Sequence, residues 1–294
     1  MAVRFDDIGN RLKAFRLASG LSADEIARRL DISRAAVYRF ERGELVKIET
    51  LEKLSELLGV SVPTLLGVGV EYLPSAVAYF ERLRQIEETA SHIIVLAGPI
   101  SYLLASPAFY QRLANVLSES IPDGVDDRKR ALADVAQIMQ ILAQRKQTYA
   151  RRRPTIVNLL AASEVGRLLQ NGLTGRFDLP ERQRRERRAH ARAEVEHLVA
   201  LMEDQPLDVQ IGIVPDTLPH TGFQIFRQPD REVLSISPFR LGEHPNVRVG
   251  VAMMTSAPEA LTLHHRAATA MWRRARKGAA AVQQLKDLLR LYKK

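Results

Sequence analysis

The sequence predicts an all-α bundle of about five helices, joined to a larger α+β region that combines a helical array with a small mixed or antiparallel sheet. Apolar residues recur at helical spacing through residues 5–66, and two glycines and a proline within 67–74 then interrupt them. In residues 207–254 apolar residues instead alternate along the chain. We therefore expect a helical domain at 1–68, a linker at 69–75, a helical region at 76–205 and an α+β domain at 206–294.

The first domain shows short helices with clear ends. Within each group its apolar residues lie three or four positions apart, as they do on one face of a helix. They fall into the groups Ile8, Leu12 and Phe15; Ile26 and Leu30; Val37 and Phe40; and Leu51, Leu54 and Leu58. Gly20, Asp31, Gly43 and Gly59 separate these groups, so each group is expected to form its own helix.

Helical signals continue from about Ala76 to Met202, and one stretch in this region is unusual. Residues 89–111 contain no Asp, Glu, Lys or Arg, a length sufficient to cross a bilayer. Its apolar runs are short, however, and Pro99 and Pro107 interrupt it. We expect a buried, proline-broken helix pair and no membrane span.

Four apolar runs after residue 206 predict a sheet of about four strands. The runs are Val209, Ile211 and Ile213; Phe223, Ile225 and Phe226; Val233, Leu234 and Ile236; and Val247, Val249 and Val251. The pattern returns to helix after Pro258.

Composition bounds the function. The chain has 294 residues, of which 46% are hydrophobic, so it can bury a sizeable core. The net charge of +9 favours an anionic partner such as nucleic acid. The sequence contains no cysteine, which excludes disulfides, thiol nucleophiles and cysteine-based zinc modules. Because its first residues also lack the pattern of a signal peptide, we expect a cytoplasmic protein.

Residues 21–41 carry the most specific pattern in the sequence. Ser22 and Glu25 have the spacing of a capping box, which predicts a sharp helix start. A tight turn at 31–32 follows, and Ser33 can cap a second helix. That helix would present Arg34, Ala35, Tyr38 and Arg39 on one side, with Val37 and Phe40 toward the core. An arginine placed so can bind guanine O6 and N7 in the major groove.

The segment LSADEIARRLDISRAAVYRFERGE resembles the helix-turn-helix of Cro/C1-type regulators of the XRE family, over about Ile8 to Leu66. The resemblance implies sequence-specific binding to double-stranded DNA. It implies that Arg16 pairs with Glu41 as a structural ion pair. It further implies DNA contacts by Ser22, Ser33, Arg34, Ala35, Tyr38, Arg39 and Lys47. The family often has Gln where this chain has Ala23, so one phosphate contact or brace is expected to be missing.

The larger region weakly resembles a sensor-like domain of unknown function found behind actinobacterial XRE regulators. An Arg-rich helix there precedes a V-x-I-x-V-V-P strand and a G-x-F strand. The matching positions here are Val209, Ile211, Ile213, Val214, Pro215, Gly222 and Phe223. The resemblance implies regulation and names no ligand.

Two groups of residues in the larger region suit an anion or ligand. The Arg-rich run at 182–192 predicts either a solvated helix face or an anion-binding surface that includes Arg184, Arg185 and Arg188. Trp272, the only tryptophan, lies beside Arg273 and predicts either helix packing or ligand stacking.

No catalytic motif is recognisable: the sequence lacks a phosphate-binding glycine loop, an HExxH motif and a GxSxG elbow. His264 and His265 are adjacent and would point about 100° apart on a helix, an arrangement that rarely binds one metal. We expect no enzyme activity, no cofactor and no metal.

The positive charge is unevenly distributed. Residues 1–66 have a net charge of only +1, whereas residues 140–200 and 266–294 have +7 and +8. The predicted DNA-binding domain therefore depends on where its cations lie, and the charged segments outside it could contact flanking DNA or another anion.

These observations predict a transcriptional regulator that binds operator DNA as a homodimer. Its larger region would sense an effector, mediate dimerisation, or both, and a small anionic effector stays open. An alternative is an antitoxin-like interaction protein that binds DNA and sequesters a partner protein. A third is an enzyme with a DNA-reading appendage.

Overall fold

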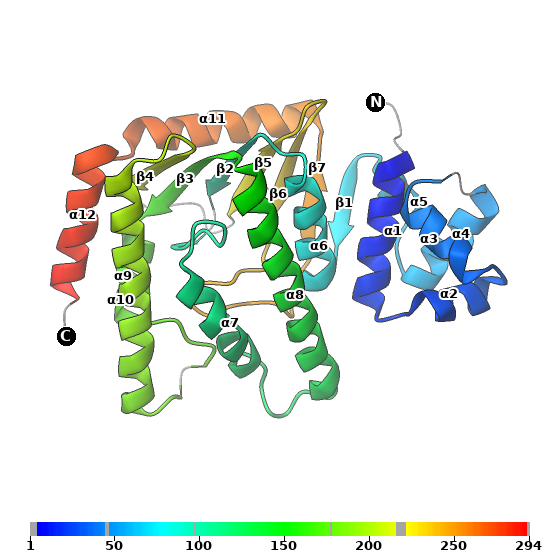
Figure 1. Cartoon of the computed structure of the whole chain (residues 1–294), viewed down its shortest axis with the longest axis horizontal. Helices are drawn as coiled ribbons and strands as arrows, with labels where there is room; N and C mark the ends of the chain where they lie inside the picture. The colour runs from blue at the N-terminus through cyan, green and yellow to red at the C-terminus, as the bar shows by residue number, and fades with distance from the viewer. Residues whose placement is uncertain (1–4, 45–46, 97, 177, 216–221, 293–294) are drawn as a thin grey trace.

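The computed structural model describes residues 5–44, 47–96, 98–176, 178–215 and 222–292. Figure 1 shows two parts along the longest axis of the molecule: a small helical bundle at one end, and a sheet with its covering helices at the other. The predicted division into an all-α domain and a larger α+β region is therefore confirmed.

The bundle consists of short helices with ends that the sequence encodes locally. They are α1 (Phe5–Ser19), α2 (Ala23–Leu30), α3 (Arg34–Glu41), α4 (Ile48–Leu58) and α5 (Val62–Leu66). Ser22, Ser33 and Ser61 cap α2, α3 and α5, and each side chain accepts the N–H of the residue three positions on. Asp31 and Gly59 end α2 and α4 in left-handed backbone.

The predicted linker at 69–75 is largely a strand. Val70–Leu73 form β1, which pairs antiparallel with β7 (Ala252–Thr255) at one edge of the sheet. The glycines before it turn the chain but do not leave it free, because Glu71 and Leu73 are buried while Tyr72 is exposed. The bundle is thus attached through the sheet itself.

Seven strands in the described residues form one mixed sheet in the order β1-β7-β6-β5-β2-β3-β4. Besides β1 and β7 they are β2 (His92–Leu96), β3 (Thr155–Ala161), β4 (Val209–Val214), β5 (Phe223–Arg227) and β6 (Glu232–Ile236). β2, β3 and β4 are parallel to one another, and the remaining pairs are antiparallel. The sheet is therefore mixed, as expected, but much larger than predicted.

Three of the four strands predicted after residue 206 are present as β4, β5 and β6, and the fourth prediction is wrong. Residues 247–251 lie outside the sheet, and β7 begins at Ala252. The side chain of Asn246 binds the backbone N–H and carbonyl of Val249, and Gly250 has a φ of 134°. These local bonds curl the segment and compete with strand pairing.

The predicted helix pair at 89–111 is also wrong in its first half, which forms β2; α7 (Pro107–Glu119) follows after a series of turns. β3 likewise lies within the region predicted to be helical. Both strands are largely covered on both faces, so their apolar residues do not alternate with polar ones, and the one polar residue inside β3, Asn158, is itself fully buried. Within the described residues, no helix is long and apolar enough to cross a membrane.

The two faces of the sheet bury different cores. Ile93 and Val95 belong to the larger core, whereas Ile94 and Leu96 pack in the smaller one, as the two-residue period of a strand requires. The larger core is covered by α6 (Ala76–Glu87), α7, α8 (Arg128–Arg152), α9 (Ala162–Asn171), α10 (Glu181–Asp204) and α12 (Gly278–Leu291). The smaller core is covered by α11 (Pro258–Arg274). The larger core continues into the bundle, where Ile8, Leu12 and Phe15 of α1 belong to it.

Candidate nucleic-acid interface

The pair α2 and α3 is shaped by short-range hydrogen bonds. The hydroxyl of Ser22 accepts the N–H of Glu25 at 3.2 Å, and the carboxylate of Glu25 accepts the N–H of Ser22 at 2.7 Å. Asp31, with φ of 53°, turns the chain, and Ser33 then accepts the N–H of Ala36 at 3.1 Å. The angle between the two helices is therefore set by residues that neighbour one another in sequence.

Helix α3 has one buried and one exposed face. Ala36 and Val37 are 7% and 4% exposed and pack inward. Arg34, Ala35, Tyr38 and Arg39 are all exposed on the other side, as predicted. The Arg34 guanidinium lies 5.6 Å from the centre of the Tyr38 ring, a cation–π contact that groups these two side chains.

The exposed arginines of α3 have weak partners. Arg34 lies 3.4 Å from Asp24 and Arg39 lies 3.7 Å from Glu44, and all four side chains are more than half exposed. Exposed pairs of this kind contribute about 0–1 kcal/mol. Each guanidinium can therefore exchange its carboxylate for a phosphate or a base edge at little cost.

Three further predicted contacts lie at helix starts. Ser22, Ser33 and Lys47 are the N-cap residues of α2, α3 and α4, and all three are exposed. The N–H groups of a helix start favour an anion, so each position suits a phosphate. Arg42, which was not predicted, is also exposed and follows Tyr38 by four positions. This spacing continues the exposed stripe and was visible in the sequence.

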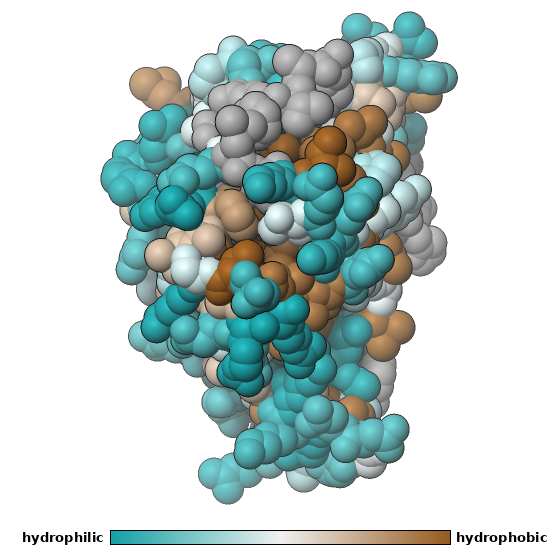
Figure 2. Space-filling view, turned by 90° about the vertical axis from the view of Figure 1, so that its right-hand side faces the viewer, coloured by the Kyte–Doolittle hydropathy of each residue, from teal (hydrophilic) through white to brown (hydrophobic). Residues whose placement is uncertain are grey.

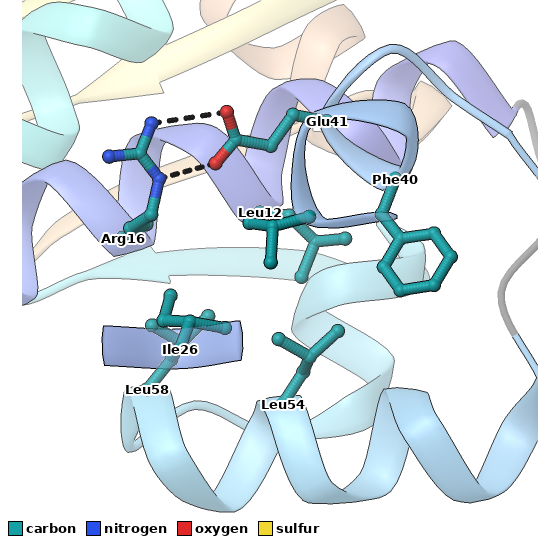
Figure 3. Close-up of a pocket in the computed structure, with 8 residues that line it drawn as sticks. Leu12, Arg16, Ile26, Phe40, Glu41, Leu54 and Leu58 are labelled. Atoms are coloured by element: carbon teal, nitrogen blue, oxygen red, sulfur yellow. Dashed lines mark hydrogen bonds and ion pairs between the residues drawn. The ribbon is translucent and has the colours of Figure 1, made fainter. Parts of the chain in front are cut away.

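The ion pair expected between Arg16 and Glu41 is present and joins the end of α3 to α1. The Arg16 guanidinium donates to both oxygens of Glu41, one of them at 3.1 Å. Figure 3 shows the pair at the edge of an apolar cluster that includes Leu12, Ile26 and Phe40. Burial disfavours the charge of Arg16, but Glu41 outweighs it and raises the pKa of the guanidinium. The pair is therefore a structural contact that orients the end of α3.

The two groups predicted to suit an anion or ligand lie in different parts of the larger region. Arg184, Arg185 and Arg188 lie near the start of α10 and all pair with Glu181. Trp272 instead packs in the smaller core, and Arg273 follows it on α11. Figure 1 places α11 at the far end of α10 from these arginines, so the two predicted groups are separated.

The two adjacent histidines of α11 also have separate partners. His264 Nδ1 lies 2.8 Å from the carbonyl of Ala260, and His265 Nε2 lies 2.9 Å from the Glu232 carboxylate. Among the residues that the structure describes, no group of three or more His, Asp or Glu is arranged to hold a metal.

The distribution of charge in space clarifies the net charge of +9. Helices α10 and α12, which belong to the basic segments, lie at the end of the molecule opposite the bundle (Figure 1). Figure 2 views the molecule from the bundle end and shows mainly hydrophilic side chains with smaller apolar areas among them. DNA bound at α3 would therefore lie far from α10 and α12 of the same chain.

Comparison with known proteins supports the assignment of the bundle. The helix-turn-helix family model matches residues 12–65, within the span 8–66 predicted from the sequence. No curated protein matches the chain. Among solved structures the chain is similar to TrmBL2, an archaeal chromatin protein with a novel mode of DNA binding, at 12% identity and a TM-score of 0.33.

That match covers 78% of this chain and 62% of the TrmBL2 chain, so the chain spans less than two thirds of that protein's length. At this TM-score the likeness is too low to inform the fold or the function. The geometry of α2 and α3 and the family match agree with each other independently of it. Residues 12–65 therefore form a helix-turn-helix domain of the Cro/C1 type within a longer chain.

Proposed function

We propose that this protein is a non-enzymatic transcriptional regulator that acts in the cytoplasm and binds operator DNA as a homodimer. The observation that carries the proposal is the exposed face of α3 in a helix-turn-helix domain. The ion pair between Arg16 and Glu41 fixes the end of this helix to α1. Its larger region would regulate operator binding in response to an effector.

In this proposal α3 enters the major groove with its first residues toward the base edges. Arg34 and Arg39 would bind guanine through the two parallel donors of a guanidinium, and Ala35 would contact a thymine methyl group. Ser22, Ser33 and Lys47 would bind phosphates on either side of the groove, together with Arg42. The domain has a net charge of only +1, so affinity would depend on these few placed groups.

We propose a homodimer because the surface that one α3 presents to DNA is small. The eight residues of α3 can read only a few base pairs, and two copies related by a two-fold axis would read two half-sites about one helical turn apart. The operator should therefore be a pseudo-palindrome.

Selection of bound DNA from a random pool by the full chain tests the proposal. We expect enrichment of a sequence with two related half-sites. On that sequence, at fixed salt, Arg34→Ala should weaken binding by roughly 10-fold or more and relax the preference at one base pair. Failure to enrich any sequence would contradict the proposal.

Arg185→Ala is the matched control, because Arg185 is an exposed arginine on α10 at the opposite end of the molecule. Operator affinity of this variant should stay within about twofold of the unchanged chain. An equal loss by Arg34→Ala on every DNA sequence would contradict a base contact and leave only a phosphate contact.

A further inference from the structure

A cavity of about 660 Å³ lies in the larger region, between α6, α8 and the ends of β2, β5 and β6. This volume is within the range of small-molecule sites, about 300–1,000 Å³. Its walls are mostly apolar and aromatic, and include Phe80, Leu83, Tyr102, Ile236 and Phe239. The cavity thus suits a molecule with an apolar or aromatic body.

The polar groups of the cavity form a small hydrogen-bonded set. The hydroxyl of Tyr79 lies 3.2 Å from Ser235 Oγ and 3.3 Å from Gln224 Nε2, and all three residues line the cavity. Ser235 is 1% exposed. Hydroxyl and amide groups can each both donate and accept hydrogen bonds, so they suit one polar group on a ligand.

The charged groups of the cavity balance one another. Arg145 lines the cavity at 3% exposure, but its guanidinium donates to both oxygens of Glu87 at 2.7 and 2.9 Å. The other charged lining residues are Arg240, Glu164 and Glu243. Glu243 is in turn paired with Arg167 at 3.5 Å, outside the lining. With Arg145 and Glu243 each paired outside the lining, Arg240 and Glu164 contribute one charge of each sign, so the lining favours a neutral ligand over an anion.

Helix α6 is a wall shared by the cavity and the helix-turn-helix domain. Tyr79, Phe80 and Leu83 line the cavity, and they lie within about 100° of one another around the helix axis. Glu81 and Gln85 lie on the opposite side, where α6 packs against α1. Figure 1 shows α6 between α8 and α1.

The contacts that hold α6 to α1 include a buried polar cluster. Gln85 Nε2 donates to the carbonyl of Asn10 at 3.0 Å. Glu71 on β1 binds Arg82 of α6 at 2.6 Å and Arg11 of α1 at 3.0 Å, and all three side chains are at most 7% exposed. Such a cluster has few alternative arrangements, because moving one member leaves a buried charge without its partner. A shift of α6 would therefore move α1 with it.

Helix α1 in turn supports the recognition helix. Arg16 pairs with Glu41 at the end of α3. Gly9 packs so closely that an added Cβ would lie 2.6 Å from Phe40 O and Gly43 N. Packed contact therefore runs without a break from the cavity wall through α6 and α1 to α3.

We propose that the cavity binds a neutral small molecule with an apolar or aromatic body and one hydrogen-bonding group, and that its occupancy changes operator affinity through α6 and α1. The ligand site stands on the cavity alone, whereas the coupling rests on the proposed function. Coupling is reciprocal, so the operator must change ligand affinity by the same factor as the ligand changes operator affinity.

Two fluorescent probes with the same ring system test the ligand site in the full chain. N-phenylnaphthylamine is neutral, and anilinonaphthalene sulfonate adds one negative charge. We expect the neutral probe to saturate at about one per chain and to bind at least as tightly as the sulfonate. A preference of 10-fold or more for the sulfonate would overturn the neutral class, and absence of saturable binding would overturn the site.

Val251→Trp and Val249→Trp form a matched pair for locating the probe. Val251 lines the cavity at 53% exposure, whereas Val249, two positions away at 69% exposure, does not line it. Val251→Trp should weaken probe binding at least 10-fold, and Val249→Trp should leave it within twofold. Leu241 lines another wall of the cavity. If Val251→Trp misfolds, Leu241→Trp provides the same test of probe binding. Unchanged binding in a folded filling variant would overturn the site.

Operator titration with and without saturating neutral probe tests the coupling. We expect operator affinity to change about fivefold or more, with the reciprocal change in probe affinity, and Val251→Trp should abolish the effect. Unchanged operator affinity with the probe bound would overturn the coupling. Failure to select any operator would overturn the proposed function and the coupling with it, while fluorescence would still decide the ligand site.

Discussion

Arginines on two helices of this protein are placed in opposite ways. Arg34 and Arg39 on α3 face solvent, and their carboxylate partners lie at 3.4 and 3.7 Å and are themselves exposed. Arg82 on α6 is 3% exposed and binds Glu71 at 2.6 Å. The first set can give up its partners to a ligand, whereas the second set would leave a buried charge uncompensated.

This difference teaches that burial, rather than residue type or net charge, decides what an arginine does here. Exposed pairs are screened by water and salt, so they contribute little to stability and stay available for binding. Buried pairs are costly to break and hold elements in register. The bundle carries both kinds, one set on its outer surface and the other where it meets the larger region.

The largest expected loss of stability follows removal of the Glu71 carboxylate, which lies between Arg11 and Arg82. Glu71→Gln leaves Arg11 and Arg82 buried without a counter-charge, so we expect a loss of about 3–5 kcal/mol in the free energy of unfolding, measured by urea denaturation. Asp24→Asn removes the partner of exposed Arg34 and should cost less than about 1 kcal/mol. If Glu71→Gln and Asp24→Asn lowered the free energy of unfolding equally, the contrast between buried and exposed arginine pairs would be refuted.

The same carboxylate predicts sensitivity to acid. Burial disfavours the ionised form of Glu71, but Arg82 and Arg11 outweigh burial and hold its pKa below the usual value. The ionised carboxylate therefore stabilises the fold at neutral pH, and this stabilisation is lost as the pH falls through the lowered pKa. Glu71→Gln should remove this part of the acid dependence in a comparison of unfolding at several pH values.

The next largest expected loss of stability follows Gly9→Ala, which adds a methyl group between α1 and α3. Gly9→Ala places Cβ at 2.6–2.7 Å from backbone atoms of residues 40–43, which cannot move independently of α3. We expect a loss of about 1–3 kcal/mol and weaker operator binding, because α3 must shift. Gly124→Ala is the control, since its Cβ would meet nothing within 4 Å, and it should leave both measurements unchanged. A neutral Gly9→Ala would show that α1 and α3 can separate freely.

Lys146 extends the comparison to a lysine held beside the cavity. Its ammonium donates to the carbonyls of Leu103 and Ala105 at 2.8 and 2.6 Å, and burial lowers its pKa to about 8 from 10.5. Above pH 8 the folded chain therefore releases this proton while the unfolded chain still holds it. As a result, the free energy of unfolding increases as the pH rises.

Comparison with Lys146→Gln isolates this effect. Between about pH 8 and 9.5 the stability of the unchanged chain should rise relative to the variant by roughly 1 kcal/mol, measured by urea denaturation at each pH. A constant difference over this range would show that Lys146 keeps an ordinary pKa in the folded protein.

The smallest expected effect on stability belongs to Arg34. Because its pair with Asp24 is exposed, Arg34→Ala should change the free energy of unfolding by less than about 0.5 kcal/mol while it weakens operator binding. Thermal unfolding of the same sample used for DNA titration provides both numbers. A large loss of stability would place Arg34 among the structural arginines and would undermine its proposed role.

The sequence predicts the bundle well because its signals are short-range. The capping box at Ser22 and Glu25, the turn at Asp31 and the cap at Ser33 all act within a few residues. The exposed face of α3 follows from helical spacing alone, although Arg42 continues it and was missed. The pair of Arg16 and Glu41 came from the family resemblance, since nothing local joins residues 25 positions apart.

The sheet was only partly predictable because two of its seven described strands, β2 and β3, carry no clear alternation. β2 and β3 are buried on both faces, so their apolar runs could equally belong to helices. β1 lies beside turn-forming glycines, and its buried Glu71 makes sense only once Arg11 and Arg82 are beside it. For the two predicted anion or ligand groups the structure adds only their surroundings: Arg184 pairs with Glu181 of its own helix, and Trp272 packs on the sheet. A ligand role for either group stays a prediction.

The sequence by itself determined the helix-turn-helix domain and the exposed face of α3, because caps, turns and helical spacing are local properties. Only the tertiary structure decided that a strand joins this domain to the sheet, that α6 separates it from a cavity, and which arginines are buried. These features depend on contacts between residues far apart in the chain, such as Arg11 with Glu71 and Gln224 with Tyr79. Burial and charge pairing across such distances become definite only when the chain has packed.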